Sequence, residues 1–209
     1  MRAFIYTGGR VDVGRVTEHP KADDIRIAAD SGYLTARALG DRVDLLVGDL
    51  DSLPAADIPE GVELIRVPAE KDDTDTQLAV ELAIERGAEE LVIIGGLGGR
   101  LDHTLSNIAI LEDLSARGVY AVMTDGRDRV RFLRSSSALI GRSEHKYLSL
   151  IAADERVRGV SIEGVRYPLK NATLTRRRQY AVSNEIVGNC ALISVRRGGI
   201  FIIESSDPA

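Results

Sequence analysis

The chain has 209 residues, of which 44% are hydrophobic and 28% are charged, and its formal net charge is −5. Such a chain is typical of an ordinary soluble globular protein that buries a core as one large domain or two small ones, and the negative charge argues against nucleic acid as a partner. With three histidines and one cysteine, metal sites rich in those ligands are excluded.

The apolar runs are too short for a membrane protein. The longest are far below the ~18 residues that a membrane span needs. The N-terminal segment MRAFIYTGGR lacks the apolar stretch and the cleavage site of a signal peptide. We therefore expect a cytoplasmic protein with no membrane partner.

Up to about residue 125, short β-rich runs alternate with helical stretches. Strands are expected at 3–7, 25–29, 43–47, 62–67, 90–95 and 119–124, and helices at 31–39, 75–86 and 103–117. Alternation of this kind predicts a mostly parallel sheet that is covered by helices.

Two of these helices carry specific signals. Thr74 and Gln77 form a T-x-x-Q capping box at the start of the helix over 75–86, and Gly87 follows its last turn. In the helix over 103–117, the apolar residues at helical spacing are expected to form the buried face. They are Leu105, Ile108, Ala109 and Leu111.

Beyond about residue 126 the helical period disappears. Short strands bounded by Gly, Asn and Pro are expected at 129–133, 147–153, 160–165, 191–195 and 199–205. They predict a small antiparallel sandwich or barrel, so we assign an α/β domain to 1–126 and a β-sandwich domain to 127–209. The apolar strand positions of the β-sandwich domain suggest an apolar face that could contact a second subunit. An internal core is the plainer account of most of them. They are Leu148, Leu150, Ile162, Ile193, Ile200 and Ile202.

Aspartates follow the carboxyl ends of the predicted parallel strands, where ligands bind in open α/β sheets. Each one alone could cap a helix or occupy a turn. Together they are expected to gather on one rim of the sheet. They are Asp30, Asp49, Asp51, Asp72, Asp73, Asp75 and Asp102.

Asp49 and Asp51 leave one predicted strand on the same side. Two carboxylates this close repel each other unless a cation lies between them. Hard oxygen ligands suit Mg²⁺, which binds one or two carboxylates and shares the phosphate oxygens of a substrate. The pair therefore predicts a magnesium site.

Glycines follow two of the predicted strands, and they let the backbone approach a phosphate closely. Lys71 and Arg100 could supply positive charge. The sequence has no G-x-x-x-x-G-K-[ST] motif, and its nearest dinucleotide fingerprint, 96–101, has leucine where the third glycine belongs. The same strand end carries Arg100, Asp102 and His103, which makes it a more specific signal than its glycines alone.

Four motifs of uncommon composition follow one another along the chain. They are GDLDS at 48–52, KDDTDT at 71–76, GGRLDHTLSNI at 98–108 and VSNEI at 182–186. Their order and spacing closely resemble the motif series of the thiamine pyrophosphokinase family. The resemblance covers nearly the whole chain, and four ordered motifs are far more specific than any one of them.

The resemblance implies a homodimer with active sites between subunits, each chain being an α/β domain followed by a β-sandwich. Its reaction would transfer the pyrophosphoryl group of ATP to the hydroxyl of thiamine and release AMP, with Mg²⁺ as the metal. Two alternatives stay open. One is another Mg²⁺-dependent nucleotide transferase that uses a different alcohol. The other is a non-catalytic thiamine or nucleotide sensor, although intact acidic and basic motifs argue against it.

The same resemblance divides the roles among the residues. Asp49, Asp51 and Asp75 would bind the metal and, with Lys71, carry the catalysis. Asp30, Thr74, Arg100, Asp102 and His103 would lie on the ATP side, and Ser183 and Asn184 on the thiamine side. Either Asp75 or Asp51 could also accept the proton of the thiamine hydroxyl. Ile186 stands where an aromatic residue is common in the family, so ring stacking on thiamine would be weaker or come from elsewhere.

Overall fold

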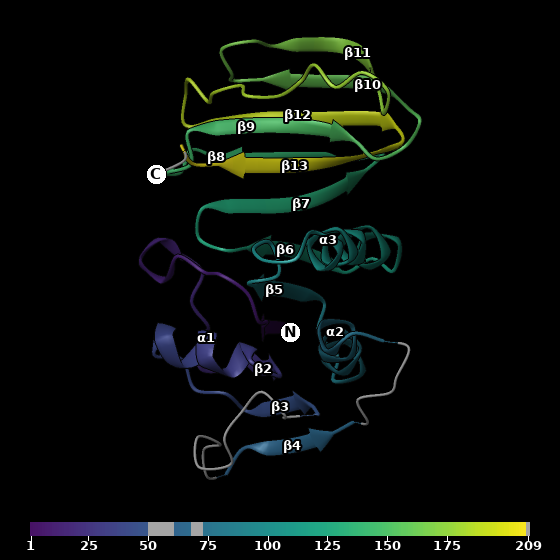
Figure 1. Ribbon diagram of the computed structural model, residues 1–209. Coiled ribbons are helices and arrows are strands. Elements are labelled where there is room, and N and C mark those ends of the chain that lie inside the picture. The colour runs from purple at the N-terminus through teal and green to yellow at the C-terminus, as the bar shows by residue number, and fades with distance from the viewer. Residues whose placement is uncertain (50–60, 68–72, 208–209) are drawn as a thin grey trace. The chain divides into compact units, whose positions relative to one another are not determined.

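The computed structural model describes residues 1–49, 61–67 and 73–207 (Figure 1). The chain forms two compact units, Met1–Gly126 and Arg127–Ala209. Among the described residues, no helix is both long enough and apolar enough to cross a membrane.

The first unit is built on a parallel sheet. Its strands are β1 (Arg2–Tyr6), β2 (Ile25–Ala29), β3 (Leu45–Gly48), β4 (Glu63–Arg66), β5 (Glu90–Ile94) and β6 (Tyr120–Thr124). Their order is β4-β3-β2-β1-β5-β6, and every neighbouring pair is parallel. The chain runs outward from β1 to β4 and then returns to pair β5 with the other side of β1. The carboxyl ends of β1 and β5 therefore form the topological switch point, where ligands bind in sheets of this kind.

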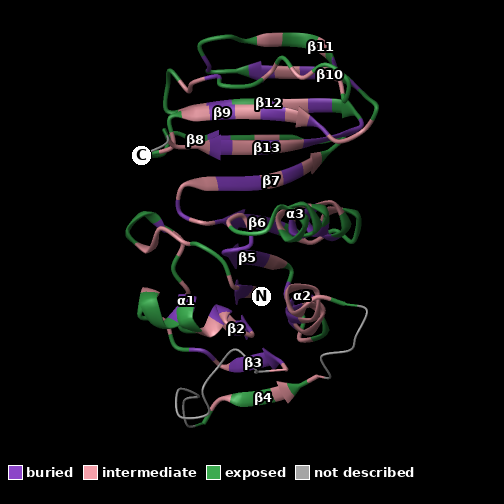
Figure 2. Cartoon of the chain, in the orientation of Figure 1, coloured by how far each residue is buried: buried purple, intermediate pink, exposed green. Residues whose placement is uncertain are grey.

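Helices cover both faces of this sheet. They are α1 (Gly32–Leu39), α2 (Asp75–Glu85) and α3 (Leu101–Ala116), with a short 3-10 turn, η1, at Val13–Arg15. Figure 1 shows α1 on one side of the strands and α2 and α3 on the other. Because both faces are covered, the central strands are buried along most of their length (Figure 2). The α/β part of the predicted fold is confirmed.

The N-terminal cap of α2 is half of the predicted capping box. The Thr74 side chain accepts a hydrogen bond from the Gln77 backbone N–H at 3.2 Å. The Gln77 side chain does not reach back to Thr74. It donates instead to Glu81 at 2.9 Å, one turn further along the helix. The reciprocal half of the box is therefore wrong, while Gly87 takes the expected left-handed conformation after the helix, with φ at 85°.

The buried face of α3 differs from the predicted one. Leu105 is 60% exposed and Ala109 is also exposed. The face that packs inward consists of Asn107, Ile110, Leu111 and Leu114. The Asn107 amide donates to the Gly96 carbonyl at 3.1 Å, so a polar residue with a satisfied hydrogen bond belongs to the buried face. A prediction from the spacing of apolar residues leaves out such a polar residue. It therefore places the buried face on a different side of the helix.

The second unit consists of antiparallel strands in two layers. They are β7 (Asp128–Arg134), β8 (Ser137–Gly141), β9 (Tyr147–Ala152), β10 (Arg156–Glu163), β11 (Leu169–Thr175), β12 (Cys190–Arg197) and β13 (Gly199–Ser205). One layer has the order β7-β13-β9 and the other the order β11-β10-β12-β8. One apolar cluster, with members from both layers, forms the core. The β-sandwich part of the predicted fold is confirmed.

Two strands of the sandwich were absent from the sequence prediction. β8 and β11 lie at opposite edges of the four-stranded layer. β8 has only Ile140 buried, and β11 only Leu174. With one buried side chain each, these edge strands show little apolar periodicity, and in β11 the alternation is confined to 172–175.

Candidate active site

A pocket of about 440 Å³ lies at the switch point of the first unit. Its floor and walls come from the residues that follow β1, β2 and β5 and from the first residues of α2 and α3. The lining includes five glycines and a set of polar side chains. The polar set contains Asp30, Asp73, Thr74, Asp75, Arg100 and His103. Of the predicted rim, Asp30, Asp73 and Asp75 therefore share one pocket.

The glycines of this pocket let the backbone itself form the surface. A Cβ atom at Gly9, whose φ is 120°, would lie 2.7 Å from the Gly98 carbonyl oxygen. At Gly96, whose φ is 78°, a Cβ would lie 2.9 Å from the Asn107 amide nitrogen. A side chain at either position would strain the backbone and crowd its neighbours. The result is a shallow cradle of the kind that receives phosphate groups.

Asp30, the residue after β2, lines this pocket. Its Oδ1 is buried, and among the described residues it has no hydrogen-bond donor. The residue has a left-handed φ of 46°, and its backbone N–H donates to the Val47 carbonyl at 2.8 Å, which fixes the turn after β2. A buried oxygen without a donor calls for one from outside the chain, such as a ligand hydroxyl, an ordered water or a cation.

Arg100 and Asp102 form a two-point ion pair at the start of α3. Arg100 Nη2 lies 2.6 Å from Asp102 Oδ2, and Arg100 Nε lies 3.2 Å from Asp102 Oδ1. The hydrogen bond from Arg100 holds the pKa of Asp102 below its usual value, and the same bond raises the pKa of Arg100. Both groups therefore stay ionised at neutral pH. Arg100 is a lining residue of the pocket, and Asp102, which is not, restrains the Arg100 side chain through this ion pair.

The predicted metal ligands are placed only in part. Asp75, the first residue of α2, lines the pocket. Asp49 follows β3 but is not among the lining residues, although a Cβ atom on Gly48 beside it would lie 3.1 Å from the Cβ of Asp30. Asp51 and Lys71 lie outside the described residues, as does Asp72. Within the described ranges, no three acidic, histidine or cysteine side chains form a metal-binding group. The magnesium site therefore stays a prediction, which the free oxygen of Asp30 favours.

A second, more apolar pocket of about 210 Å³ lies in the sandwich unit. Its lining includes Tyr167, which is 65% exposed, and Tyr180, which is 47% exposed. Asn184 lines this pocket, whereas Ser183 is exposed and is not among the lining residues. Ser183 has a left-handed φ of 55°, and its backbone N–H donates to the Ser149 hydroxyl at 3.0 Å. Of the two residues predicted on the thiamine side, the structure brings one to the pocket.

The two tyrosines were not predicted from the sequence. They supply aromatic rings where Ile186 supplies none. In the sequence, Tyr180 lies two residues before Val182, the first residue of the VSNEI motif, and Tyr167 lies further upstream. An aromatic residue close to that motif was the available signal. Chain order alone does not show which side chains share a pocket, because β11 and a long loop separate these residues.

Comparison with known proteins gives the family. The sequence profile described as "Thiamin pyrophosphokinase, catalytic domain" matches residues 17–123, and that described as "Thiamin pyrophosphokinase, vitamin B1 binding domain" matches residues 137–200. The chain belongs to the thiamin pyrophosphokinase family.

Relatives agree with this assignment over most of their length. The thiamine pyrophosphokinase of Bacillus subtilis is 29% identical over 186 residues, which is 87% of each chain. A crystal structure of thiamine pyrophosphokinase from Bacillus subtilis superposes with a TM-score of 0.89 at 25% identity and covers 100% of both chains. The enzyme from Geobacillus thermodenitrificans superposes with a TM-score of 0.86 at 28% identity and covers 100% of this chain and 99% of that one.

Proposed function

We propose that this protein transfers the pyrophosphoryl group of ATP to the hydroxyl of thiamine, giving thiamine diphosphate and AMP. Family membership supports the reaction. The observation that carries it to this chain is the switch-point pocket, whose lining combines five glycines with Asp30, Asp75 and Arg100.

In this pocket the chain would bind the triphosphate of ATP through two kinds of group. Backbone N–H groups of the glycine turns would contact phosphate oxygens, and Arg100, held by Asp102, would neutralise part of their charge. Bound Mg²⁺ would stabilise the charge that develops on the transferred phosphates. Asp49 and Asp75, together with Asp51 outside the described residues, are the carboxylates that we propose would hold it. Because pyrophosphoryl transfer needs little covalent help from a protein, positioning and charge are the main contributions of these residues.

The apolar pocket of the sandwich unit suits the organic substrate. Tyr167 and Tyr180 offer ring faces, and Leu148 and Leu150 offer an apolar wall. Ring faces attract both aromatic rings and organic cations, and thiamine has one aminopyrimidine ring and one cationic thiazolium ring. We therefore place the thiamine rings here. Tyr167 and Tyr180 would then supply the ring stacking that Ile186 cannot provide.

We propose a cytoplasmic homodimer in which one pocket binds ATP and the other binds thiamine. The apolar strand residues that suggested a partner face from the sequence lie in the sandwich core, so they supply no such face. Exposed apolar side chains occur instead on α3, where Leu101 is 71% exposed and Leu105 is 60% exposed. Apolar surface on an exposed helix favours contact with another chain.

Sedimentation is expected to show a dimer at assay concentration, and Leu105→Glu is expected to shift the population toward monomer. The physical reason is that a carboxylate on α3 would have to be desolvated in the contact. Glu112→Gln on the same helix changes a partly exposed polar side chain and serves as the control. A fully active wild-type monomer would refute the dimer, and a dimer unaffected by Leu105→Glu would place its interface elsewhere.

The reaction is tested by incubating the protein with thiamine, ATP and Mg²⁺ and analysing the nucleotide products. Release of AMP together with thiamine diphosphate is the expected result. Release of ADP would instead show simple phosphoryl transfer, and turnover with another alcohol only would show a different transferase. Binding of thiamine or ATP without turnover would show a sensor. Each of these three outcomes would overturn the proposed function.

A further inference from the structure

The side-chain amide of Asn184 is engaged by backbone groups rather than presented to the sandwich pocket that it lines. Its Oδ1 accepts hydrogen bonds from the backbone N–H groups of Tyr167 and Glu185, both at 3.0 Å. Its Nδ2 donates to the backbone carbonyl of Tyr167 at 2.8 Å. The residue is 7% exposed. One side chain thus pairs with both the N–H and the C=O of Tyr167, as a neighbouring strand would.

The backbone of Asn184 holds a second wall of the same pocket. Its N–H donates to the Leu148 carbonyl at 3.0 Å, and its own carbonyl accepts from the Leu148 N–H at 2.8 Å. Leu148 belongs to β9, and Tyr167 lies in the connection between β10 and β11. Asn184 therefore joins two segments that are far apart in the sequence and that both line the pocket.

The backbone of Tyr167 is held at this junction. Tyr167 lies outside the named strands, and Pro168 after it has no N–H with which to continue a ladder. The preceding residue, Arg166, is tied to Glu185 by a backbone hydrogen bond of 2.9 Å. At Tyr167 itself, the side-chain amide of Asn184 makes both backbone hydrogen bonds that a neighbouring strand would make. The exposed ring is thus carried on a backbone that a buried side chain fixes.

We propose that Asn184 is a positioning residue, whose amide fixes the Tyr167 backbone so that the Tyr167 ring forms a wall for the substrate rings. Asn184 does not itself contact the substrate. This inference rests on the proposed function, because it takes the sandwich pocket to receive thiamine.

A double-mutant cycle on Asn184 and Tyr167 tests the inference. The kcat and the KM values for thiamine and ATP are measured for wild type, Asn184→Ala, Tyr167→Ala and the double variant. Asn184→Ala is expected to raise the KM for thiamine about tenfold, as loss of one or two buried hydrogen bonds would, and to leave the KM for ATP within about twofold. In the Tyr167→Ala background, the same substitution is expected to change the KM for thiamine by less than about threefold, because the ring that it positions is gone.

A second variant separates positioning from direct contact. Asn184→Asp keeps an acceptor for the two N–H groups but faces the Tyr167 carbonyl with a carboxylate oxygen instead of a donor. A positioning role predicts that its KM for thiamine rises at least as much as that of Asn184→Ala. Direct contact with the thiazolium cation predicts a fall, because a carboxylate attracts it. A fall would overturn the inference.

Asn189→Ala, an exposed asparagine of the same unit that does not line the pocket, is the matched control and should leave both KM values unchanged. If Asn184→Ala does not fold, Asn184→Ser replaces it with the same criterion. Independent effects of Asn184 and Tyr167, multiplying in the double variant, would overturn the positioning role. If wild type releases no AMP, the proposed function fails; if it does release AMP and the effects multiply, only the positioning role fails.

Discussion

Asp75→Asn and Asp49→Asn are each expected to lower turnover with thiamine and ATP by at least about tenfold, equivalent to roughly 1.4 kcal/mol of barrier. Asp75 lines the switch-point pocket at the start of α2, and Asp49 directly follows Gly48, the last residue of β3, which lies beside Asp30. Each substitution keeps the shape of the side chain but removes a negative charge that would hold Mg²⁺. We expect the same loss for Asp51→Asn, which lies outside the described residues.

The free energy of unfolding should change little in the Asp49 and Asp75 variants, because neither residue belongs to the buried core. Thermal unfolding and steady-state rates at saturating Mg²⁺ check both parts of the prediction. Asp23→Asn, an exposed aspartate outside the pocket, is the matched control and should match wild type. Losses below about tenfold in all the site variants would contradict the metal role of this rim.

The parallel half of the fold was predictable because its strands are buried on both faces. Continuous apolar runs such as those of β1 and β5 follow from that burial, and helical stretches between them leave few alternatives for the topology. The edge strands of the sandwich were not predictable in the same way. β8 and β11 each bury one side chain, so their strand structure depends on pairing with neighbours that the local sequence does not show.

The candidate site was predictable at the level of the strand ends and less so at the level of side chains. Chain order places Asp30, Asp75 and Arg100 after β2, β4 and β5, and all three line one pocket. Chain order does not show that the Asp102 side chain pairs with Arg100 and does not line the pocket, because that depends on side-chain direction at the start of α3. The engagement of the Asn184 amide by Tyr167 is beyond sequence reasoning for the same reason, because it joins two loops through one side chain.

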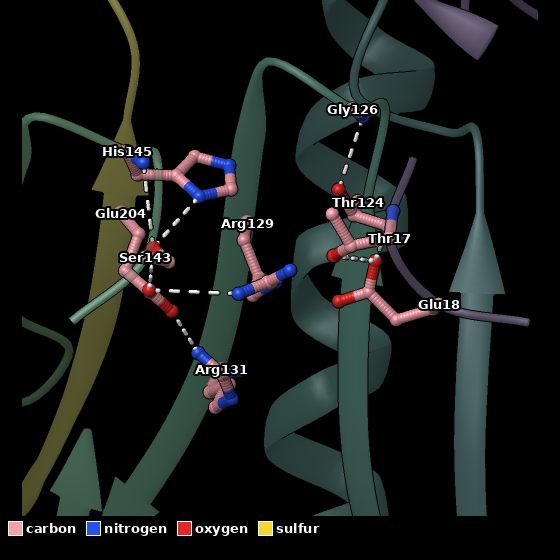
Figure 3. A network of polar contacts seen from close by, with 9 residues as sticks. All are labelled: Thr17, Glu18, Thr124, Gly126, Arg129, Arg131, Ser143, His145 and Glu204. Atoms are coloured by element: carbon pink, nitrogen blue, oxygen red, sulfur yellow. Dashed lines mark hydrogen bonds and ion pairs between the residues drawn. The ribbon is translucent and has the colours of Figure 1, made fainter. Parts of the chain in front are cut away.

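Glu204→Gln is expected to destabilise the protein by about 3 to 5 kcal/mol, the usual cost of removing one partner from a buried ion pair. Glu204 lies on β13, and its side chain is 3% exposed. One carboxylate oxygen contacts Arg131, and the other lies 3.6 Å from Arg129 Nη1 and accepts from the Ser143 hydroxyl at 3.1 Å (Figure 3). Both arginines extend from β7, the strand that pairs with β13.

The reason for so large an effect is that two arginine side chains, which are 10% and 16% exposed, would keep their charge after the carboxylate is lost. Neither can release its proton at neutral pH, so the mutant holds both positive charges in a partly dry site with one buried counter-charge fewer. Urea denaturation followed by circular dichroism measures the change. Glu163→Gln, an exposed glutamate of β10, should lie within about 0.5 kcal/mol of wild type. If Glu204→Gln costs less than about 1 kcal/mol, the carboxylate is not what holds these two cations in the sandwich.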